Sequence, residues 1–130
     1  MILLDTHIWY WWVDNLRKLS ATQQKHLVDN ESTGLGVSVI SCWEIAKASS
    51  LGRISLKFDV SVWIRQALAY PGIQLLDLTP GIAIESCQLP GVFHRDPADQ
   101  LLVATARIIG ISMLTADAKI LAYPHVSLLV

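Results

Sequence analysis

The sequence predicts an α/β fold in which a short, mostly parallel sheet is covered by helices on both faces. Short apolar segments alternate along the chain with longer helical patterns, which is the order of βαβ units. Apolar strands of this kind are typical of a parallel sheet that is buried on both sides. The chain has 130 residues and neither an internal repeat nor a low-complexity segment, so we expect one domain over residues 1–130.

Five segments are predicted as strands. The first runs from the N-terminus directly into Asp5, and its four apolar residues indicate a buried strand with a carboxylate at its C-terminal end. Gly34 and Gly36 indicate a turn before the second strand. The predicted strands cover residues 1–4, 37–40, 73–78, 112–115 and 126–129.

Helices are predicted between the strands, and those in the first half of the chain have polar N-caps. Thr6 is expected to cap a helix over residues 7–15, and Ser20 is expected to cap one that ends at residue 30. Ser41 and Glu44 have the spacing of a capping box, which predicts a helix from there to about residue 50.

The helices of the second half begin at Asp59, Pro80, Asp96 and Asp117. Asp96 and Pro97 give the strongest start signal, because an N-cap is followed by a proline in the first helical position. That helix is expected to run to residue 109, where a glycine follows. The others are expected to span residues 60–70, 80–88 and 117–122.

Composition limits the kind of protein. The chain is 52% hydrophobic and 16% charged, yet no apolar run approaches the roughly 20 residues that span a bilayer. We therefore expect a cytoplasmic protein without a membrane segment, whose surplus apolar surface meets a protein partner. The net charge of −1 excludes a general basic field, so any nucleic-acid binding must use a local patch.

Two further features concern burial. Four adjacent aromatic residues point all round the first predicted helix, and they fit either a deeply buried helix or one with a face against a partner subunit. These are Trp9, Tyr10, Trp11 and Trp12. Cys42 and Cys87 form neither a disulfide framework nor a metal-binding spacing, and we interpret both as core residues.

Five of the eleven acidic residues lie at the ends of predicted strands or at the starts of predicted helices. The carboxyl ends of parallel strands and the N-termini of the helices that follow them share one edge of a sheet. These side chains are therefore candidates for a single cleft. They are Asp5, Glu44, Asp96, Asp99 and Asp117.

Each of the five also has a purely structural explanation. Glu44 fits the third helical position of a capping box, and Asp96 and Asp117 fit helix caps. Asp99 could merely complement the helix dipole, although it shares its face with apolar residues. Asp5 is hardest to explain in this way, because a charge at the end of a buried strand is costly without a counter-ion.

A cluster of carboxylates repels itself, and a hard divalent cation relieves that repulsion. Mg²⁺ or Mn²⁺ prefers oxygen ligands and retains several waters, and the sequence has no His or Cys pairs at zinc spacing. Such a site suits phosphodiester hydrolysis, in which the ion positions and deprotonates a water and neutralises charge on the phosphate oxygens.

At these residues the chain resembles the PIN-domain family, and within it the VapC-like toxins of bacterial toxin–antitoxin systems. The matching segments are Leu3 to His7, Ser41 to Ile45, Asp99 to Ala106 and Leu114 to Asp117, in the family's order. The resemblance implies a three-layer α/β/α sandwich, a Mg²⁺- or Mn²⁺-dependent endoribonuclease, a homodimer and inhibition by a cognate antitoxin. It assigns the catalytic and metal-binding acids to Asp5, Glu44, Asp99 and Asp117, and leaves Asp96 as a cap or an outer-shell ligand.

Neighbours of the acids are candidates for supporting roles. The hydroxyls of Thr6 and Thr115 could hold a carboxylate or a metal-bound water, or could serve only helix capping and strand formation. His7 is expected to be a packed helix residue rather than a ligand. Four basic side chains near the expected cleft are candidate RNA contacts: His94, Arg95, Lys47 and Arg53.

Two other classes of function remain open. A receiver-like α/β module would accept a phosphoryl group on one aspartate beside a metal, but it would need paired acids where Asp5 stands alone. A non-enzymatic interaction module would use the acids only to cap helices. Stable labelling by a small phosphodonor would identify the first, and an absence of Mg²⁺ and Mn²⁺ binding in calorimetry would identify the second.

Overall fold

Four parallel strands form the centre of the structure, a computed structural model that describes residues 1–130. They lie in the order β3-β2-β1-β4. The strands are β1 (Ile2–Leu4), β2 (Leu35–Ser38), β3 (Ile73–Leu76) and β4 (Ser112–Leu114). The helices are α1 (Thr6–Asp14), α2 (Ala21–Asn30), α3 (Val39–Ser50), α4 (Val60–Leu68), α5 (Pro80–Ser86), α6 (Pro97–Ile109) and α7 (Ala118–Leu121), with a short 3₁₀ helix, η1 (Leu16–Lys18).

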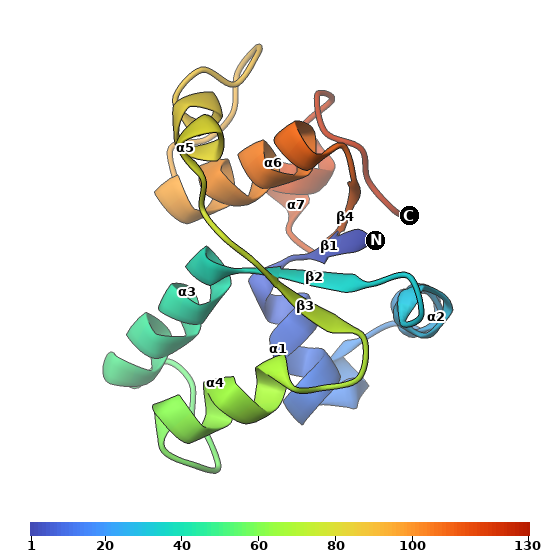
Figure 1. Ribbon diagram of the computed structural model, residues 1–130, viewed down its shortest axis with the longest axis vertical. Coiled ribbons are helices and arrows are strands. Elements are labelled where there is room, and N and C mark those ends of the chain that lie inside the picture. Colours follow the sequence, from blue (N-terminus) through green and yellow to red (C-terminus); the bar gives the residue numbers. More distant parts are fainter.

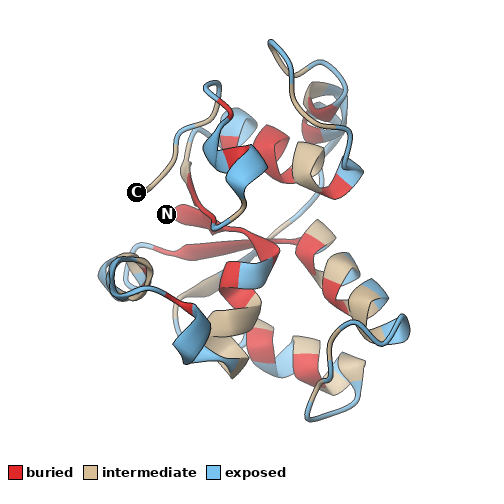
Figure 2. Ribbon diagram, turned by 180° about the vertical axis from the view of Figure 1, so that it is seen from behind, coloured by how far each residue is buried: buried red, intermediate tan, exposed pale blue.

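Helices cover both faces of the sheet. Figure 1 shows α1, α3 and α4 on one side and α5, α6 and α7 on the other. Successive side chains of β1 point to opposite faces. Ile2 and Leu4 pack into one core with Trp9, whereas Leu3 packs into the other with Leu102. The buried segments in Figure 2 accordingly run through the strands and along the inner sides of α1 and α6. The predicted three-layer α/β/α sandwich is confirmed, and its sheet is entirely parallel.

The place of β4 beside β1 determines where a site can form. The chain passes outward from β1 to β2 and β3 and then crosses back to β4 on the far side of β1. The register pairs Leu4 with Leu114, so Asp5 and Thr115 leave the sheet next to each other. In open α/β sheets, ligands bind outside the carboxyl ends of the strands at such a switch in strand order.

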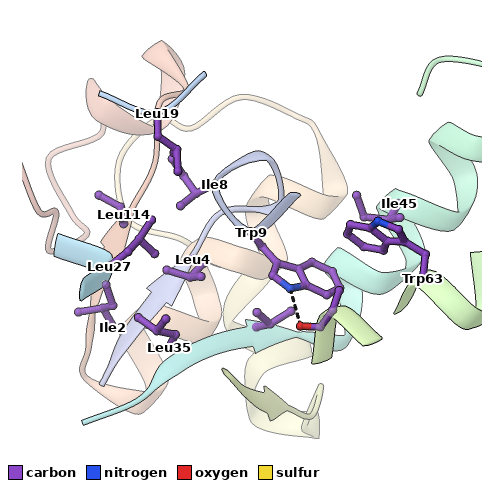
Figure 3. Packing of buried hydrophobic residues seen from close by; sticks show 12 residues of the cluster. Ile2, Leu4, Ile8, Trp9, Leu19, Leu27, Leu35, Ile45, Trp63 and Leu114 are labelled. Carbon is purple, nitrogen blue, oxygen red and sulfur yellow. Dashed lines mark hydrogen bonds between the residues drawn. The ribbon is translucent and has the colours of Figure 1, made fainter. Parts of the chain in front are cut away.

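The aromatic run of α1 is partly explained by the chain's own core. Trp9 is fully buried, meets Trp63 edge-on at 5.4 Å between ring centroids, and donates from Nε1 to the Ala67 carbonyl at 3.3 Å (Figure 3). The three aromatic residues that follow pack against the same core but stay half-buried: Tyr10, Trp11 and Trp12.

β2 lies two residues earlier than predicted. Gly36 belongs to the strand rather than to a turn. A Cβ at Gly36 would lie 3.2 Å from the Ile2 carbonyl oxygen and 2.8 Å from the Leu76 Cδ1, so the missing side chain makes room for close packing at the centre of the sheet. The glycine signal was misread because it reflects close packing here, not a turn.

α3 consequently starts earlier too, and the predicted capping box is wrong. Ser38 caps this helix, and its hydroxyl accepts the Ile40 N–H. Ser41 and Glu44 lie inside the helix, with Ser41 buried and Glu44 in the second turn rather than the first. The capping explanation for Glu44 therefore does not apply.

Other predictions need smaller corrections. Asp5 rather than Thr6 caps α1, because the Asp5 carboxylate accepts the Thr6 N–H. Residues 126–129 form no regular strand and meet β4 through an isolated bridge between Met113 and Leu128 and a hydrogen bond between the Ser112 and Ser127 hydroxyls. Cys87 is exposed at the end of α5 instead of lying in the core. The remaining elements are present, with ends that differ by one or two residues. None of the helices has the length and apolar character that a membrane crossing requires.

Candidate active site

Asp5 is a buried carboxylate at the end of β1. Its side chain accepts the Thr6 N–H at 2.8 Å through Oδ1 and the Thr115 hydroxyl at 2.6 Å through Oδ2. Only 6% of the residue is exposed. Burial raises the pKa of Asp5, and these two hydrogen bonds oppose that rise only in part. The carboxylate is thus held in place by both of its oxygens.

Thr115 connects Asp5 to Asp117. While its hydroxyl donates to Asp5, the same oxygen accepts the Asp117 N–H at 3.0 Å. The Asp117 carboxylate caps α7 by accepting the backbone N–H groups of Lys119 and Ile120. The predicted structural role of Asp117 is therefore present, and its carboxylate still raises the pKa of Asp5 by repulsion.

Glu44 reaches the same edge of the sheet from α3. Its Oε1 lies 2.5 Å from the Thr6 hydroxyl, which also contacts the Ser41 hydroxyl at 2.8 Å. Burial raises the pKa of Glu44, and repulsion from Asp5 and Asp96 adds to the rise. Thr6 and Thr115 therefore each support one carboxylate.

Asp99 is repelled by all four of the other acids. Burial raises the pKa of Asp99 to about 7, and repulsion from four other carboxylates contributes: Asp5, Asp96, Asp117 and Glu44. Its Oδ2 lies 2.9 Å from the Nε2 of His94, within ion-pair distance but not in hydrogen-bonding alignment. The five acids thus form one electrostatic site.

Asp96 has a structural role in α6. Its side chain caps the helix by accepting the Asp99 N–H at 3.0 Å, and the residue is exposed. Asp99 lies three residues later, half-buried, on the side of α6 that faces the other acids. Proximity to both Asp5 and Glu44 distinguishes Asp99 from a residue that only complements the helix dipole.

The donor set fits a hard divalent cation. All five acids offer oxygen atoms, and four of them raise the pKa of the fifth. No three or more His, Cys, Asp or Glu side chains already converge closely enough to ligate an ion directly. Mg²⁺ needs only one or two direct carboxylates, because it retains several waters. The spread of the acids is compatible with such a hydrated ion.

Two clefts flank the acids and share Asp96. One has a volume of about 540 Å³ and is polar, and its charged lining is His94, Arg95, Asp96, Asp99, Asp117 and Lys119. The other has a volume of about 590 Å³ and is half apolar. We call it the aromatic cleft, and its lining comes from α1, α3, the loop after α3 and the start of α6. Lys47 and Arg53 line the aromatic cleft, whereas His94 and Arg95 line the polar one.

Sequence reasoning missed several residues of these clefts. His7 is exposed and lines the aromatic cleft, so its assignment as a packed residue was wrong. Trp43, exposed on α3, lies in the same cleft. Lys119 enters the polar cleft, which its position two residues after Asp117 could have indicated. Ser41 could not have been placed, because its contact with Thr6 depends on where α3 begins.

A parallel α/β/α sandwich with acids gathered at its strand-order switch is the class of fold that the resemblance implied. The family model of the PIN domain matches residues 2–126, and the chain belongs to the PIN domain family.

The chain is 32% identical over 124 residues to Ribonuclease VapC22 of Mycobacterium tuberculosis (strain ATCC 25618 / H37Rv), which covers 95% of this chain and 92% of that protein.

Solved structures agree on the fold. The structure of VapBC2 from Rickettsia felis bound to a promoter DNA fragment contains a chain with a TM-score of 0.73 and 15% identity, and the match covers 99% of this chain and 98% of that one. FitAcB from Neisseria gonorrhoeae gives a TM-score of 0.68 at 18% identity, covering 100% and 97%. At these identities the likeness concerns the fold.

Proposed function

We propose that this chain is a divalent-metal-dependent endoribonuclease and the toxin of a toxin–antitoxin pair. The observation that supports this most directly is the group of mutually repelling carboxylates at the β1/β4 switch, in which burial and repulsion raise the pKa of Asp99 to about 7. The similarity to Ribonuclease VapC22 supports RNA as the substrate.

Asp5, Glu44, Asp99 and Asp117 are the proposed catalytic acids and the residues that would hold Mg²⁺ or Mn²⁺. A bound ion would supply positive charge beside the phosphate and activate a water for attack on phosphorus. Thr115 and Thr6 keep Asp5 and Glu44 in place through the hydrogen bonds described above. Without an ion, repulsion and burial raise the pKa of Asp99 to about 7, and a bound cation would favour the charged carboxylate.

Basic side chains on both sides of the acids are the proposed RNA contacts. His94, Arg95 and Lys119 line the polar cleft, and Lys47 and Arg53 line the aromatic cleft. A phosphodiester chain that enters one cleft and leaves by the other would pass Asp96, the residue that the two clefts share. The basic side chains of the two clefts would attract RNA locally, since the net charge of −1 excludes a general basic field.

The proposed partners are a cognate antitoxin and a second copy of the chain, in the cytoplasm. Tyr10, Trp11 and Trp12 stay half-buried in the isolated chain, which leaves apolar surface for such contacts. A toxin–antitoxin complex from Klebsiella pneumoniae has a similar fold, with a TM-score of 0.65. Sedimentation of the purified protein should show the mass of two chains, and a mass of one chain at all concentrations would contradict the homodimer.

Asp5→Asn tests the enzymatic function. Asparagine keeps the shape of the side chain and can still accept the Thr6 N–H, so the fold should survive. RNA cleavage in Mg²⁺ or Mn²⁺ should fall by about 100-fold or more, as when an enzyme loses a group that stabilises transition-state charge. Asp29→Asn is the matched control, because Asp29 is an exposed acid paired with Lys25 on α2. Wild-type cleavage by Asp5→Asn would refute the proposed site.

A further inference from the structure

The aromatic cleft has a composition that the proposed metal site does not require. We propose that it binds one unpaired base of the RNA next to the cleaved phosphate, with the base stacked on Trp43. This inference rests on the proposed ribonuclease function and adds a specificity-determining residue to it.

The cleft presents aromatic surface to solvent. Trp43 is 55% exposed although the chain buries two other tryptophans, Trp9 and Trp63, almost completely. Lys47 lies four residues after Trp43 on α3, so both side chains occupy one helix face. His7 and Tyr10 face them from α1, three residues apart. A volume of about 590 Å³ is within the range of pockets that bind small organic groups such as a nucleobase.

The cations of this cleft indicate RNA rather than an apolar segment of a protein. The ion pairs of the chain are Lys25 with Asp29, His94 with Asp99, and Arg107 with Glu85, so neither Lys47 nor Arg53 is paired within the chain. Two unpaired cations beside an exposed indole are the combination that binds the backbone and a stacked base of a single strand.

The acids fix the cleft's position relative to the chemistry. Glu44 and Asp96 line the aromatic cleft and also belong to the group that raises the pKa of Asp99. A base on Trp43 therefore lies within the same site as the phosphate beside the acids. A base paired in a duplex is not free to enter, so the cleft favours single-stranded RNA.

The test measures binding apart from cleavage. A fluorescently labelled single-stranded RNA that the wild-type protein cleaves is bound to Asp5→Asn in Mg²⁺ and followed by anisotropy, with each nucleotide replaced in turn by an abasic one. Loss of the base at one position beside the cleavage site should weaken binding by about 10- to 100-fold, as expected for one stacked base. Trp43→Ala should weaken binding of the intact RNA equally, and Trp43→Phe should recover most of the affinity.

The decisive result is the combination of the two changes. If the base stacks on Trp43, the abasic RNA should bind Trp43→Ala no more weakly than the intact RNA does, because the two changes remove the same contact. Phe58→Ala is the matched control: Phe58 is 52% exposed, is not part of the aromatic cleft, and should leave binding unchanged.

Several results would overturn the inference. One is that the losses of affinity from the abasic RNA and from Trp43→Ala add in full. Another is that Trp43→Ala binds the RNA as tightly as the protein that keeps Trp43. If Trp43→Ala abolished self-association but left RNA binding unchanged, the cleft would be a protein interface instead. These results would leave the ribonuclease intact if the wild-type protein still cleaved RNA. A wild-type protein that neither binds nor cleaves RNA in Mg²⁺ or Mn²⁺ would remove both proposals.

Discussion

At the scale of single residues, two threonine hydroxyls organise the acids. Thr115 bridges Asp5 and the backbone of Asp117, and Thr6 bridges Glu44 and Ser41. A buried carboxylate without such donors would be protonated or would distort its surroundings, because burial disfavours the charged form. These hydroxyls therefore help to maintain the charge that a metal site requires.

Thr115→Val tests this role. Valine has nearly the same shape but leaves the Asp5 Oδ2 and the Asp117 N–H without their partner. We expect a loss of about 1–3 kcal/mol in unfolding free energy, the cost of leaving buried polar groups unsatisfied. The measurement is urea unfolding.

Thr105→Val is the control. The Thr105 hydroxyl is buried too, but it donates only to the Leu101 carbonyl within α6. Its replacement should cost less than Thr115→Val. Equal losses for the two variants would show that the contact with Asp5 has no special weight.

At the scale of elements, the start of α6 separates two acids that lie three residues apart. Asp96 caps the helix from an exposed position, and Asp99 lies half-buried in its first turn. Three residues make almost one full helix turn, so the two side chains lie near the same side of the helix axis. The two carboxylates therefore belong to the same site, but Asp96 is exposed at its rim whereas Asp99 is half-buried.

Asp96→Ser should separate capping from chemistry. Serine also caps helices, so the unfolding free energy should change by less than about 1 kcal/mol. RNA cleavage should stay within about tenfold of wild type, since Asp96 is proposed as a cap or outer-shell group rather than a principal ligand. Asp99→Ser, in contrast, should lose cleavage almost completely. If Asp96→Ser lost cleavage and Asp99→Ser kept it, Asp96 would be the metal-binding acid and Asp99 the supporting one.

At the scale of the whole molecule, the cluster makes the metal-free fold sensitive to pH. The pKa of Asp99 rises from 3.8 to about 7 on folding. Between these values the folded chain binds more protons than the unfolded chain. Stability from this group is therefore highest at low pH and falls as pH rises toward 7. Burial raises the pKa of Asp5 and of Glu44 as well, which acts in the same direction.

Urea unfolding in EDTA at pH 5 and pH 8 measures this effect. The wild-type protein should be less stable at pH 8, by about 2–3 kcal/mol from Asp99, because only the part of the shift above pH 5 acts in this window. Asp99→Asn should reduce the difference in stability between the two pH values. When Mn²⁺ replaces EDTA, the wild-type protein should regain stability at pH 8. A wild-type protein that is equally stable at both pH values would contradict the proposed repulsion.

Local sequence signals were sufficient for much of the fold. Asp96 with Pro97 predicts the start of α6, because a cap and a first-turn proline act on adjacent backbone groups. The alternation of apolar strands and helices predicts the layers, since both faces of the sheet must be covered. Because the strands are recognisable as apolar segments, the sequence also shows which acids lie next to their ends. Asp5 was correctly placed at the end of a buried strand.

Only the tertiary structure decided which of these elements meet. Thr115 contacts Asp5 because β4 pairs with β1, and no neighbouring residue in the sequence encodes that pairing. Glu44 points to the acids because α3 begins at Val39 and places residue 44 in its second turn. Capping follows from a few adjacent residues, whereas pairing and register follow from burying both faces of the sheet at once. The sequence thus determined the acids available to the site, and the packing of the sheet determined their arrangement.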